Sequence, residues 1–360
     1  MKQKTFSFDH NALMHWFNTH KRDLPWRHSP EPYQVWVSEI MLQQTQVDVV
    51  IPYYTRWMKR FPTLKDLALA KLDEVIKLWE GLGYYSRARN LHFGAQQVMQ
   101  EFDGVLPDNA DDLKRIKGLG PYTVGAILSF AFKQKAAAVD GNVMRVLARY
   151  FLIQEDISKP QVIKKIRSLT EEILPDKHPW VMTEGLIELG ALICKRKAEC
   201  GACPLKMTCL AHTKNQTSLL PYKAKKVIYT PLYRAVAIIM SDNMILLKRG
   251  EKGKIMSDLH EFPYIETDEK GLSINDFKKS LDNSMSLGLT YQKSYSIVPQ
   301  SFTKYRVRLS PVLFSTFTQA APDGFEWFSL EAIHSLAFSS GHKRILNYYL
   351  QDKHETHSSH

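Results

Sequence analysis

The chain of 360 residues has little cysteine, few long apolar runs and fewer acidic than basic side chains. Its longest apolar runs, such as Ala235 to Met240, are far shorter than the ~20 residues that a membrane-spanning helix needs. Lys2 and Lys4 stand near the start, but no apolar stretch follows them. We therefore expect neither a membrane span nor a signal peptide, and we expect a cytoplasmic protein.

The charge balance is strongly basic. Lysine and arginine number 48 against 37 aspartates and glutamates, which gives a formal net charge of +11. This excess favours a polyanionic partner, with nucleic acid ahead of an acidic membrane surface. Many basic proteins bind neither, so charge alone does not decide the function.

The four cysteines all lie within sixteen residues, with the spacing C-x5-C-x2-C-x5-C. A disulfide pair would need an oxidising compartment, for which nothing in the sequence argues. Four free thiols crowded together by chance are improbable, so the pattern favours a four-thiolate site for zinc or an iron–sulfur cluster. The spacing alone leaves both metals open. The predicted ligands are Cys194, Cys200, Cys203 and Cys209.

The spacing of apolar residues along the chain changes after the last cysteine. Up to that point, apolar residues recur at three- and four-residue spacing, which predicts helices, whereas from Tyr229 onward short Val, Ile and aromatic runs predict strands. No internal repeat is found. We expect a mainly α domain over 1–212, a linker over 213–226, an α+β domain over 227–350 and a disordered tail over 351–360.

One turn is suited to gripping a phosphate. Gly118 and Gly120 lie between two apolar helices, the second of which begins at Pro121. The backbone amides there would point at an anion without reading sequence. An ordinary helix–helix corner explains the same pattern, but the basic residues within 114–117 favour DNA.

Two carboxyls stand in apolar surroundings. Glu39 belongs to a helix whose neighbours are almost all apolar, so it either faces solvent or is held with a raised pKa. Asp140 ends an apolar segment and precedes a helix near Val143, and either it or Asn142 caps that helix.

A glycine turn over 79–90 combines an apolar tip, Tyr84, Tyr85 and two arginines. Such a turn is suited to wedging and stacking into a strained duplex. The alternative is that both tyrosines are core aromatics. Each of these motifs alone can be explained by a purely structural role. Their occurrence together in one helical domain that ends in four cysteines has no such explanation.

In this order the motifs resemble those of the helix-hairpin-helix DNA glycosylases, and within them the adenine glycosylases of the MutY type. The resemblance is strong from about Phe8 to the linker and weaker beyond it. The segments that carry it are Leu24-Pro-Trp-Arg27, Val37-Ser-Glu39-Ile-Met-Leu-Gln-Gln44-Thr, Glu80-Gly-Leu82-Gly-Tyr84-Tyr85, Gly118-Leu-Gly120-Pro-Tyr122-Thr and Val139-Asp140-Gly-Asn142-Val.

The resemblance implies a six-helix barrel module and a second helical lobe with a [4Fe–4S] cluster, held by the four cysteines. The substrate would be adenine opposite 8-oxoguanine or guanine in double-stranded DNA, and the protein a nucleoid-associated monomer. Glu39 matches the acid that protonates adenine N7, and Asp140 the carboxylate facing C1′, as glycoside cleavage after base flipping requires. Further matches are Tyr122 and Asn142 beside that site, Arg27 and Glu184 beside the extruded base, Gln44, Leu82 and Tyr84 in the duplex near the oxidised guanine, and Gly118 and Gly120 in the hairpin.

Relatives that also cut the DNA backbone carry a nucleophilic lysine where this chain has Tyr122, so no Schiff base would form there. We therefore predict a monofunctional glycosylase whose product is an abasic site. The family usually has six residues between its first two cysteines and this chain has five, which implies a tightened first loop.

The C-terminal part resembles the family's Nudix-like domain, which recognises 8-oxoguanine. Its reading loop is usually Phe-Ser-His, and this chain aligns Phe302, Thr303 and Lys304 with it, so the hydroxyl is kept and the imidazole is replaced. No Nudix box of metal-binding glutamates follows the opening strand, which argues against a nucleotide hydrolase.

Two other functions were weighed. Tyr122 and the Nudix-like part argue against a glycosylase/lyase acting on oxidised pyrimidines. Glu39 and Asp140 argue against a non-catalytic DNA-binding scaffold that keeps only the hairpin, the cluster and the basic surface.

Overall fold

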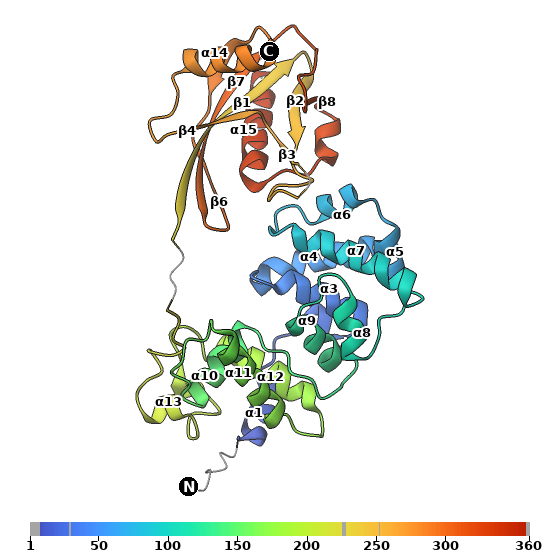
Figure 1. Cartoon of the computed structure of the whole chain (residues 1–360), viewed down its shortest axis with the longest axis vertical. Coiled ribbons are helices and arrows are strands. Elements are labelled where there is room, and N and C mark those ends of the chain that lie inside the picture. Colours follow the sequence, from blue (N-terminus) through green and yellow to red (C-terminus); the bar gives the residue numbers. More distant parts are fainter. Residues whose placement is uncertain (1–7, 29, 225–227, 252, 358–360) are drawn as a thin grey trace. The chain divides into compact units, whose positions relative to one another are not determined.

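The computed structural model describes residues 8–28, 30–224, 228–251 and 253–357 (Figure 1). The chain divides into two compact units. The helical unit comprises Met1–Leu69 and Asn90–Lys226, and the sheet unit comprises Ala70–Arg89 and Val227–His360. The expected boundary at residue 227 lies outside the described residues. The expected first domain is not continuous, because Ala70–Arg89 belongs to the sheet unit.

Helices build the helical unit, as the sequence predicts. Proline stands at the start of α3, α9, α11 and α12, where the missing N–H costs nothing. None of the described helices is both long and apolar enough to cross a membrane. The elements are α1 (His10–His20), α2 (Pro25–His28), α3 (Pro32–Leu42), α4 (Val47–Arg60), α5 (Leu64–Leu69), α7 (Ser86–Glu101, which begins in the sheet unit), α8 (Ala110–Arg115), α9 (Pro121–Ala126), the π-helix η1 (Ile127–Ala131), α10 (Gly141–Tyr150), α11 (Pro160–Ile173), α12 (Pro179–Leu192), the 3₁₀ helix η2 (Cys200–Ala202) and α13 (Leu210–Thr213).

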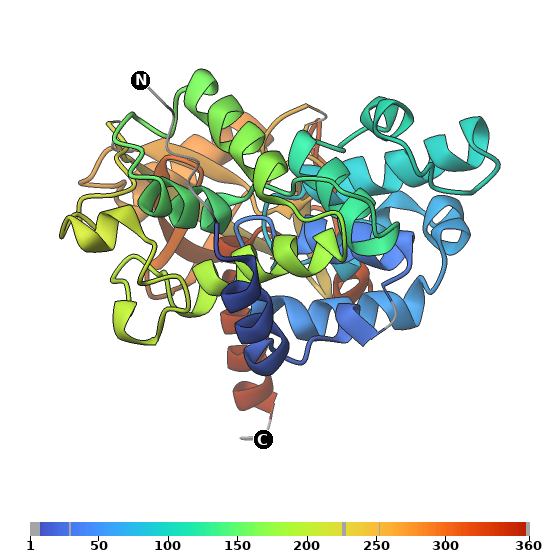
Figure 2. The ribbon, with the colours of Figure 1, turned by 90° about the horizontal axis from the view of Figure 1, so that it is seen from below.

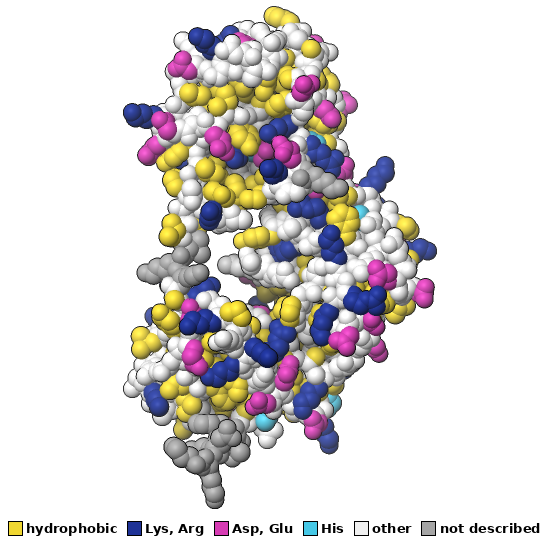
Figure 3. All heavy atoms as spheres, in the orientation of Figure 1, with side chains coloured by type: hydrophobic (Ala, Val, Ile, Leu, Met, Phe, Trp, Pro, Cys, Tyr) yellow, Lys and Arg dark blue, Asp and Glu magenta, His cyan; other side chains and the backbone are white. Residues whose placement is uncertain are grey.

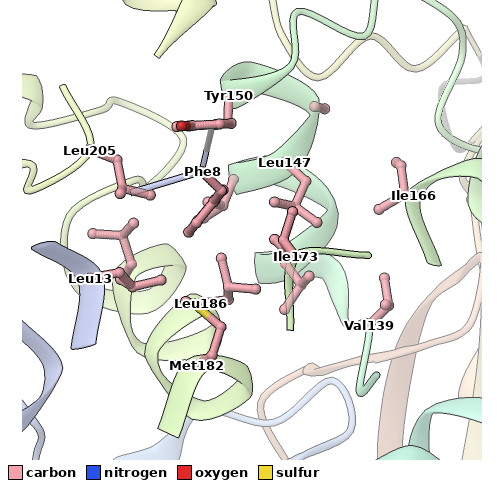
Figure 4. Packing of buried hydrophobic residues seen from close by; sticks show 14 of the residues in the cluster. Phe8, Leu13, Val139, Leu147, Tyr150, Ile166, Ile173, Met182, Leu186 and Leu205 are labelled. Atoms are coloured by element: carbon pink, nitrogen blue, oxygen red, sulfur yellow. The ribbon is translucent and has the colours of Figure 1, made fainter. Parts of the chain in front are cut away.

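One core of this unit lies where α1 and α10 pack against α12, with α11 alongside α10 (Figure 4). Its side chains come from segments far apart in sequence, so burial of apolar surface joins α1 to α10 and α12. Separately, α3 packs against α4, α9 and η1. The labelled core residues are Phe8, Leu13, Val139, Leu147, Tyr150, Ile166, Ile173, Met182, Leu186 and Leu205.

The expected linker is anchored on the helical unit as far as residue 224. The carbonyl of Leu220 accepts a hydrogen bond from Arg149 Nε at 2.8 Å, and the carbonyl of Tyr222 accepts one from the Ile157 N–H at 3.0 Å. Leu220 itself is buried. The polar composition of 213–226 predicts a linker, and in the structure these two backbone carbonyls pair with groups of the helical unit. Residues 225 and 226 lie outside the described residues.

The sheet unit is α+β, as predicted, and its strands order as β3-β2-β1-β7-β5, with β4 on β1, β6 on β7 and β8 on β2. The central pair β1 and β7 is parallel, from Thr230 opposite Tyr305 to Met240 opposite Ser315. The elements are α6 (Leu72–Leu78), β1 (Thr230–Ser241), β2 (Met244–Arg249), β3 (His260–Glu261), β4 (Tyr264–Thr267), α14 (Ile274–Met285), β5 (Thr290–Ser294), β6 (Val298–Phe302), β7 (Tyr305–Ser315), β8 (Glu326–Ser329), the 3₁₀ helix η3 (Ala332–Ser335) and α15 (Ser340–His357).

The period of two in β1 gives this sheet two apolar faces, because successive strand side chains point to opposite sides. Val236 and Ile238 pack in one cluster with Ile345 of α15. Ala237 and Ile239, offset by one residue, pack in another with Phe277 and Leu281 of α14. The sheet is therefore covered by α15 on one face and by α14 on the other (Figure 1).

The C-terminal tail differs from the expectation. Disorder was expected over 351–360, but α15 continues as a helix to His357 (Figure 2), and 358–360 lie outside the described residues. Asp352 explains the extension, because its carboxylate accepts hydrogen bonds from Lys293 and from Tyr295, whose oxygen lies 2.9 Å away. These partners in and beside β5 are distant in sequence.

Candidate active site

The Glu39 carboxyl is buried in the helical unit. It belongs to α3, where nearly every neighbour is apolar, and the residue is only 6% exposed. Of the two interpretations that the sequence allowed, the buried one is therefore right. Burial raises the pKa of Glu39 to about 7, and the charge of Asp140 acts in the same direction.

Tyr122 is the hydrogen-bond partner of this carboxyl. It is the second residue of α9, and its hydroxyl donates to Glu39 Oε2 at 2.5 Å. This bond favours the ionised carboxylate and opposes the effect of burial on the Glu39 pKa. Burial, followed by the nearby carboxylates, holds the pKa of Tyr122 well above its usual value. The tyrosine therefore serves as a fixed neutral donor.

Asp140 both caps a helix and keeps an oxygen in the site. Its Oδ1 accepts from the Val143 N–H at 2.8 Å at the start of α10, which confirms the capping interpretation. Its Oδ2 accepts from Asn142 Nδ2 at 2.7 Å. Burial raises the pKa of Asp140, while the hydrogen bonds from Val143 and Asn142 counteract that rise. The carboxylate is thus aimed by its own helix.

Arg145 connects this carboxylate to the cysteine region. Its Nη2 donates to Asn142 Oδ1 at 2.7 Å and to the carbonyl of Gly190 at 2.9 Å, while its Nε donates to the carbonyl of Cys194 at 2.7 Å. The orientation of Asn142, and through it that of Asp140, therefore depends on the backbone next to the first cysteine. The sequence analysis did not identify Arg145. Its position about one helical turn after Asn142 in the same helix could have indicated that the two side chains interact.

A buried ion-pair network forms another wall of the site. Glu188 is fully buried and accepts from Arg22 Nε at 2.8 Å and from Arg27 Nη2 at 3.0 Å. Arg27 Nε lies 3.5 Å from Glu184 Oε2. Although burial acts to raise it, the hydrogen bonds and charges of the two arginines hold the pKa of Glu188 below its usual value. The sequence analysis identified neither Glu188 nor Arg22. Glu188 could have been found from its spacing, because it lies four residues after Glu184 and therefore on the same face of an apolar helix.

A cavity of about 710 Å³ brings the predicted catalytic residues together. This volume falls in the range typical of small-molecule sites. Gln44, whose backbone φ is +58°, also lines it, which places the predicted duplex-facing residue beside the catalytic groups. The predicted residues that line the cavity are Arg27, Glu39, Gln44, Tyr122, Asp140, Asn142 and Glu184.

The predicted hairpin lies between α8 and α9. Gly118 has a φ of +90°, and a Cβ atom there would come within 2.7 Å of the Asn90 Cβ, so only glycine fits. Gly120 is exposed, and a Cβ atom there would meet nothing within 4 Å. Lysines and arginines are spread over the helical elements in Figure 3 with acidic side chains between them, which indicates a dispersed basic surface on this face.

The glycine turn before α7 belongs to the sheet unit. Gly81, Gly83 and Tyr84 have φ values of +102°, +74° and +49°. Tyr84 is 48% exposed, so the alternative of a core aromatic is wrong for this residue, whereas Leu82 is buried. The guanidinium of Arg87 lies 5.4 Å from the ring centre of Tyr84.

The residues aligned with the 8-oxoguanine reading loop form the tight turn between β6 and β7. Phe302 ends β6, and Thr303 follows in the left-handed region with a φ of +48°. Lys304 is exposed, and its ammonium lies 5.4 Å from the Tyr305 ring centre. The turn presents a hydroxyl and an ammonium to solvent.

The four cysteines line one small cavity of about 20 Å³ next to Arg149. Arg149 is buried and donates from Nη1 to Cys194 Sγ at 3.3 Å and to the carbonyl of Lys195 at 2.7 Å. Burial, together with the neighbouring cysteines, raises the pKa of Cys203 to about 11. In the part of the chain that the structure describes, no group of three or more His, Cys, Asp or Glu side chains is arranged to hold a metal ion.

Comparison with known proteins assigns both units. Residues 37–172 match the model of the HhH-GPD superfamily of base excision DNA repair proteins, and residues 234–348 match the NUDIX domain. A solved thermostable thymine-DNA glycosylase is similar to the helical part, with a TM-score of 0.53 and 29% identity over 57% of this chain and 94% of that chain. The fold is thus that of the helix-hairpin-helix repair proteins, joined to a Nudix-like domain.

Relatives over the greater part of the chain narrow this class. The adenine DNA glycosylase of Buchnera aphidicola subsp. Baizongia pistaciae is 38% identical over 71% of this chain and 73% of its own length. That of the subspecies Schizaphis graminum is 31% identical over 94% of this chain and 97% of its own. The chain belongs to the adenine DNA glycosylase family, of the MutY type.

Proposed function

We propose that this protein is a monofunctional adenine DNA glycosylase that removes adenine paired with 8-oxoguanine or guanine, acting as a monomer on double-stranded DNA. Its relatives are named adenine DNA glycosylases, which supports adenine as the base removed. The observation that carries the proposal is the buried Glu39, with a pKa of about 7, in the same cavity as Asp140.

The two carboxyls have the complementary states that cleavage of an N-glycosidic bond requires. With its pKa raised to about 7, Glu39 can hold a proton near neutral pH and give it to adenine N7. Departure of the protonated base leaves an oxocarbenium-like sugar, which the Asp140 carboxylate stabilises at C1′. Arg27 and Glu184, held in place by Glu188, would border the flipped base.

The product would be an abasic site rather than a cut strand. A lyase forms a Schiff base through an amine, and the matching position is Tyr122, whose hydroxyl is bonded to Glu39. No lysine is among the described residues that line the catalytic cavity.

Cys194, Cys200, Cys203 and Cys209 would hold a [4Fe–4S] cluster, and the residues present fit it. All four line one cavity beside the Arg149 cation, which suits thiolates. The cysteine spacing alone leaves zinc open, and the family resemblance favours the cluster. Such a cluster would join the end of α12 to α13. Iron content and visible absorbance of the purified protein test this, and stoichiometric zinc without iron would contradict it.

The remaining predicted residues would contact the duplex rather than the reacting bond. Gln44 and Tyr84 would enter it near the oxidised guanine, and Leu82, which is buried in the free protein, would have to leave its packing to join them. The amides of Gly118 and Gly120 would hold a phosphate. Phe302 and Thr303 would face 8-oxoguanine from the β6–β7 turn, and Lys304 would add an electrostatic contact with the DNA.

A single-turnover assay on a duplex with one A:8-oxoguanine pair tests the function, read with and without alkali. Strand breaks only after alkali would support adenine excision without lyase activity. Breaks without alkali would contradict the assignment as monofunctional, and tight binding without cleavage would favour a scaffold.

A further inference from the structure

The turn 81–85 is attached at its base to a segment of the sheet unit about 250 residues later in the chain. Glu80, the residue just before the turn, accepts the Phe338 N–H on Oε1 at 2.8 Å. Tyr85, at the other end, donates its hydroxyl to the Phe338 carbonyl at 3.3 Å and accepts the Gly81 N–H at 3.1 Å. Both ends of the turn therefore bond the peptide groups of one residue.

Lysines reinforce the attachment around Glu80. Lys77 donates from Nζ to Glu80 Oε2 at 2.8 Å and to the Leu336 carbonyl at 2.7 Å. Lys343 of α15 lies 3.7 Å from the same Oε2. The Glu80 side chain is only 15% exposed, so these charge-assisted bonds are partly shielded from water.

Further ion pairs flank the attachment on either side. Arg89 pairs with Asp258 at 3.1 Å and donates to the Ser257 carbonyl at 3.0 Å. Arg249 pairs with Asp73. These groups hold 70–89 as a whole to the strands, whereas Glu80 and Tyr85 act at the turn itself.

We infer that Glu80 is a positioning residue for DNA recognition: its carboxylate, through the Phe338 N–H, fixes the duplex-facing turn 81–85 on the Nudix-like domain. This inference rests on the proposed function, because it gives the turn its role in the duplex. Three backbone positions in the turn have positive φ, so the local chain has little preference for this shape without external bonds. The turn 81–85 and the Nudix-like domain, to which we assign 8-oxoguanine recognition, would therefore contact the DNA as one unit.

The test uses the full-length protein and three variants: Glu80→Ala, Glu80→Gln and the control Glu269→Ala. The glutamine keeps an oxygen that can accept the Phe338 N–H, and Glu269 is an exposed acid of the same unit. The probe is a duplex with 2′-fluoro-2′-deoxyadenosine opposite 8-oxoguanine, whose sugar resists cleavage. Binding affinity and amide hydrogen exchange over 81–85 are measured on it, and single-turnover excision is measured on the ordinary A:8-oxoguanine duplex with saturating enzyme.

We expect Glu80→Ala to bind about tenfold more weakly and to exchange faster over 81–85, because it loses charge-assisted bonds. Its excision rate at saturation should stay within about twofold of wild type, since the catalytic cavity lies in the helical unit. Glu80→Gln should recover much of the affinity, and Glu269→Ala should match wild type.

Wild-type affinity and exchange in Glu80→Ala, or an equal loss in Glu269→Ala, would overturn the inference. So would a defect confined to the saturating rate. If Glu80→Ala does not fold, Tyr85→Phe replaces it, since it removes only the hydroxyl bonded to Phe338, and unchanged binding would then count against the inference. If the wild-type protein does not excise adenine from the A:8-oxoguanine duplex, the proposed function itself would be overturned.

Discussion

The catalytic cavity and the β6–β7 turn differ in how their polar groups are supported. Around Glu39 and Asp140, buried and half-buried side chains bond to one another, and the pKa of each carboxyl is raised above its usual value. In the turn, Thr303 and Lys304 are exposed to solvent. Bond cleavage needs protonation states that are fixed before the substrate arrives, whereas recognition groups obtain their partners from the DNA. Substitutions in the two regions should therefore affect different measurements.

The largest effect is expected for Glu39→Gln. The amide can still accept the Tyr122 hydrogen bond but cannot donate the acidic proton, so excision should fall about 1000-fold or more. DNA affinity should stay near that of wild type. Single-turnover excision and equilibrium binding on the same duplex check this, and near-normal turnover would remove Glu39 from the role of acid.

Asp140→Asn should reduce excision about 100-fold, because the charge beside the developing cation is lost. Asparagine is as good a helix cap as aspartate, so α10 should keep its start and the melting temperature should change little. Single-turnover rates and thermal unfolding separate the two roles. An unchanged rate would contradict a catalytic role for the carboxylate.

Tyr122→Phe should change the pH profile. Wild-type excision should fall as pH rises through about 7, where Glu39 loses its proton. Burial is the largest cause of the raised pKa and the Tyr122 hydrogen bond opposes it, so removing the hydroxyl should raise the pKa further. The alkaline limb should then move to higher pH in single-turnover rates, and a move to lower pH would refute this assignment.

The smallest effect is expected for Lys304→Ala. An exposed ammonium contributes mainly a phosphate contact, so binding should weaken by a few-fold, equally for 8-oxoguanine and guanine duplexes. Lys279→Ala, an exposed lysine on α14, is the charge-matched control. A loss confined to the 8-oxoguanine duplex would make Lys304 a specific reader.

Sequence patterns predicted the features that local chemistry determines. The change from helix to strand periods, the Asp140 cap and the hairpin glycines follow from residues near one another in the chain. Even the buried state of Glu39 was one of two open interpretations, because its neighbours in α3 are apolar.

Features that depend on distant partners could not be predicted in this way. The role of Glu188 becomes clear only when Arg22 and Arg27 are seen beside it. These partners lie far away in the chain, so the sequence around Glu188 does not reveal them. The same is true of Asp352, whose bonds to β5 and to Tyr295 extend α15, and of Leu220, whose carbonyl pairs with Arg149. The [4Fe–4S] cluster and the reading turn came from the family resemblance and stay predictions.

The assignment of Ala70–Arg89 to the sheet unit has a consequence for synthesis of the chain. Its hydrogen-bond partners at Leu336 and Phe338 are made last. At bacterial and eukaryotic elongation rates, the ribosome needs on the order of ten seconds to a minute to reach them after this segment emerges. During that interval the helical unit completes its own sequence, but it must carry this segment as an unfinished loop. A nascent chain that stops short of Phe338 therefore leaves part of its N-terminal half without a folding partner, which makes it a target for chaperones and proteases.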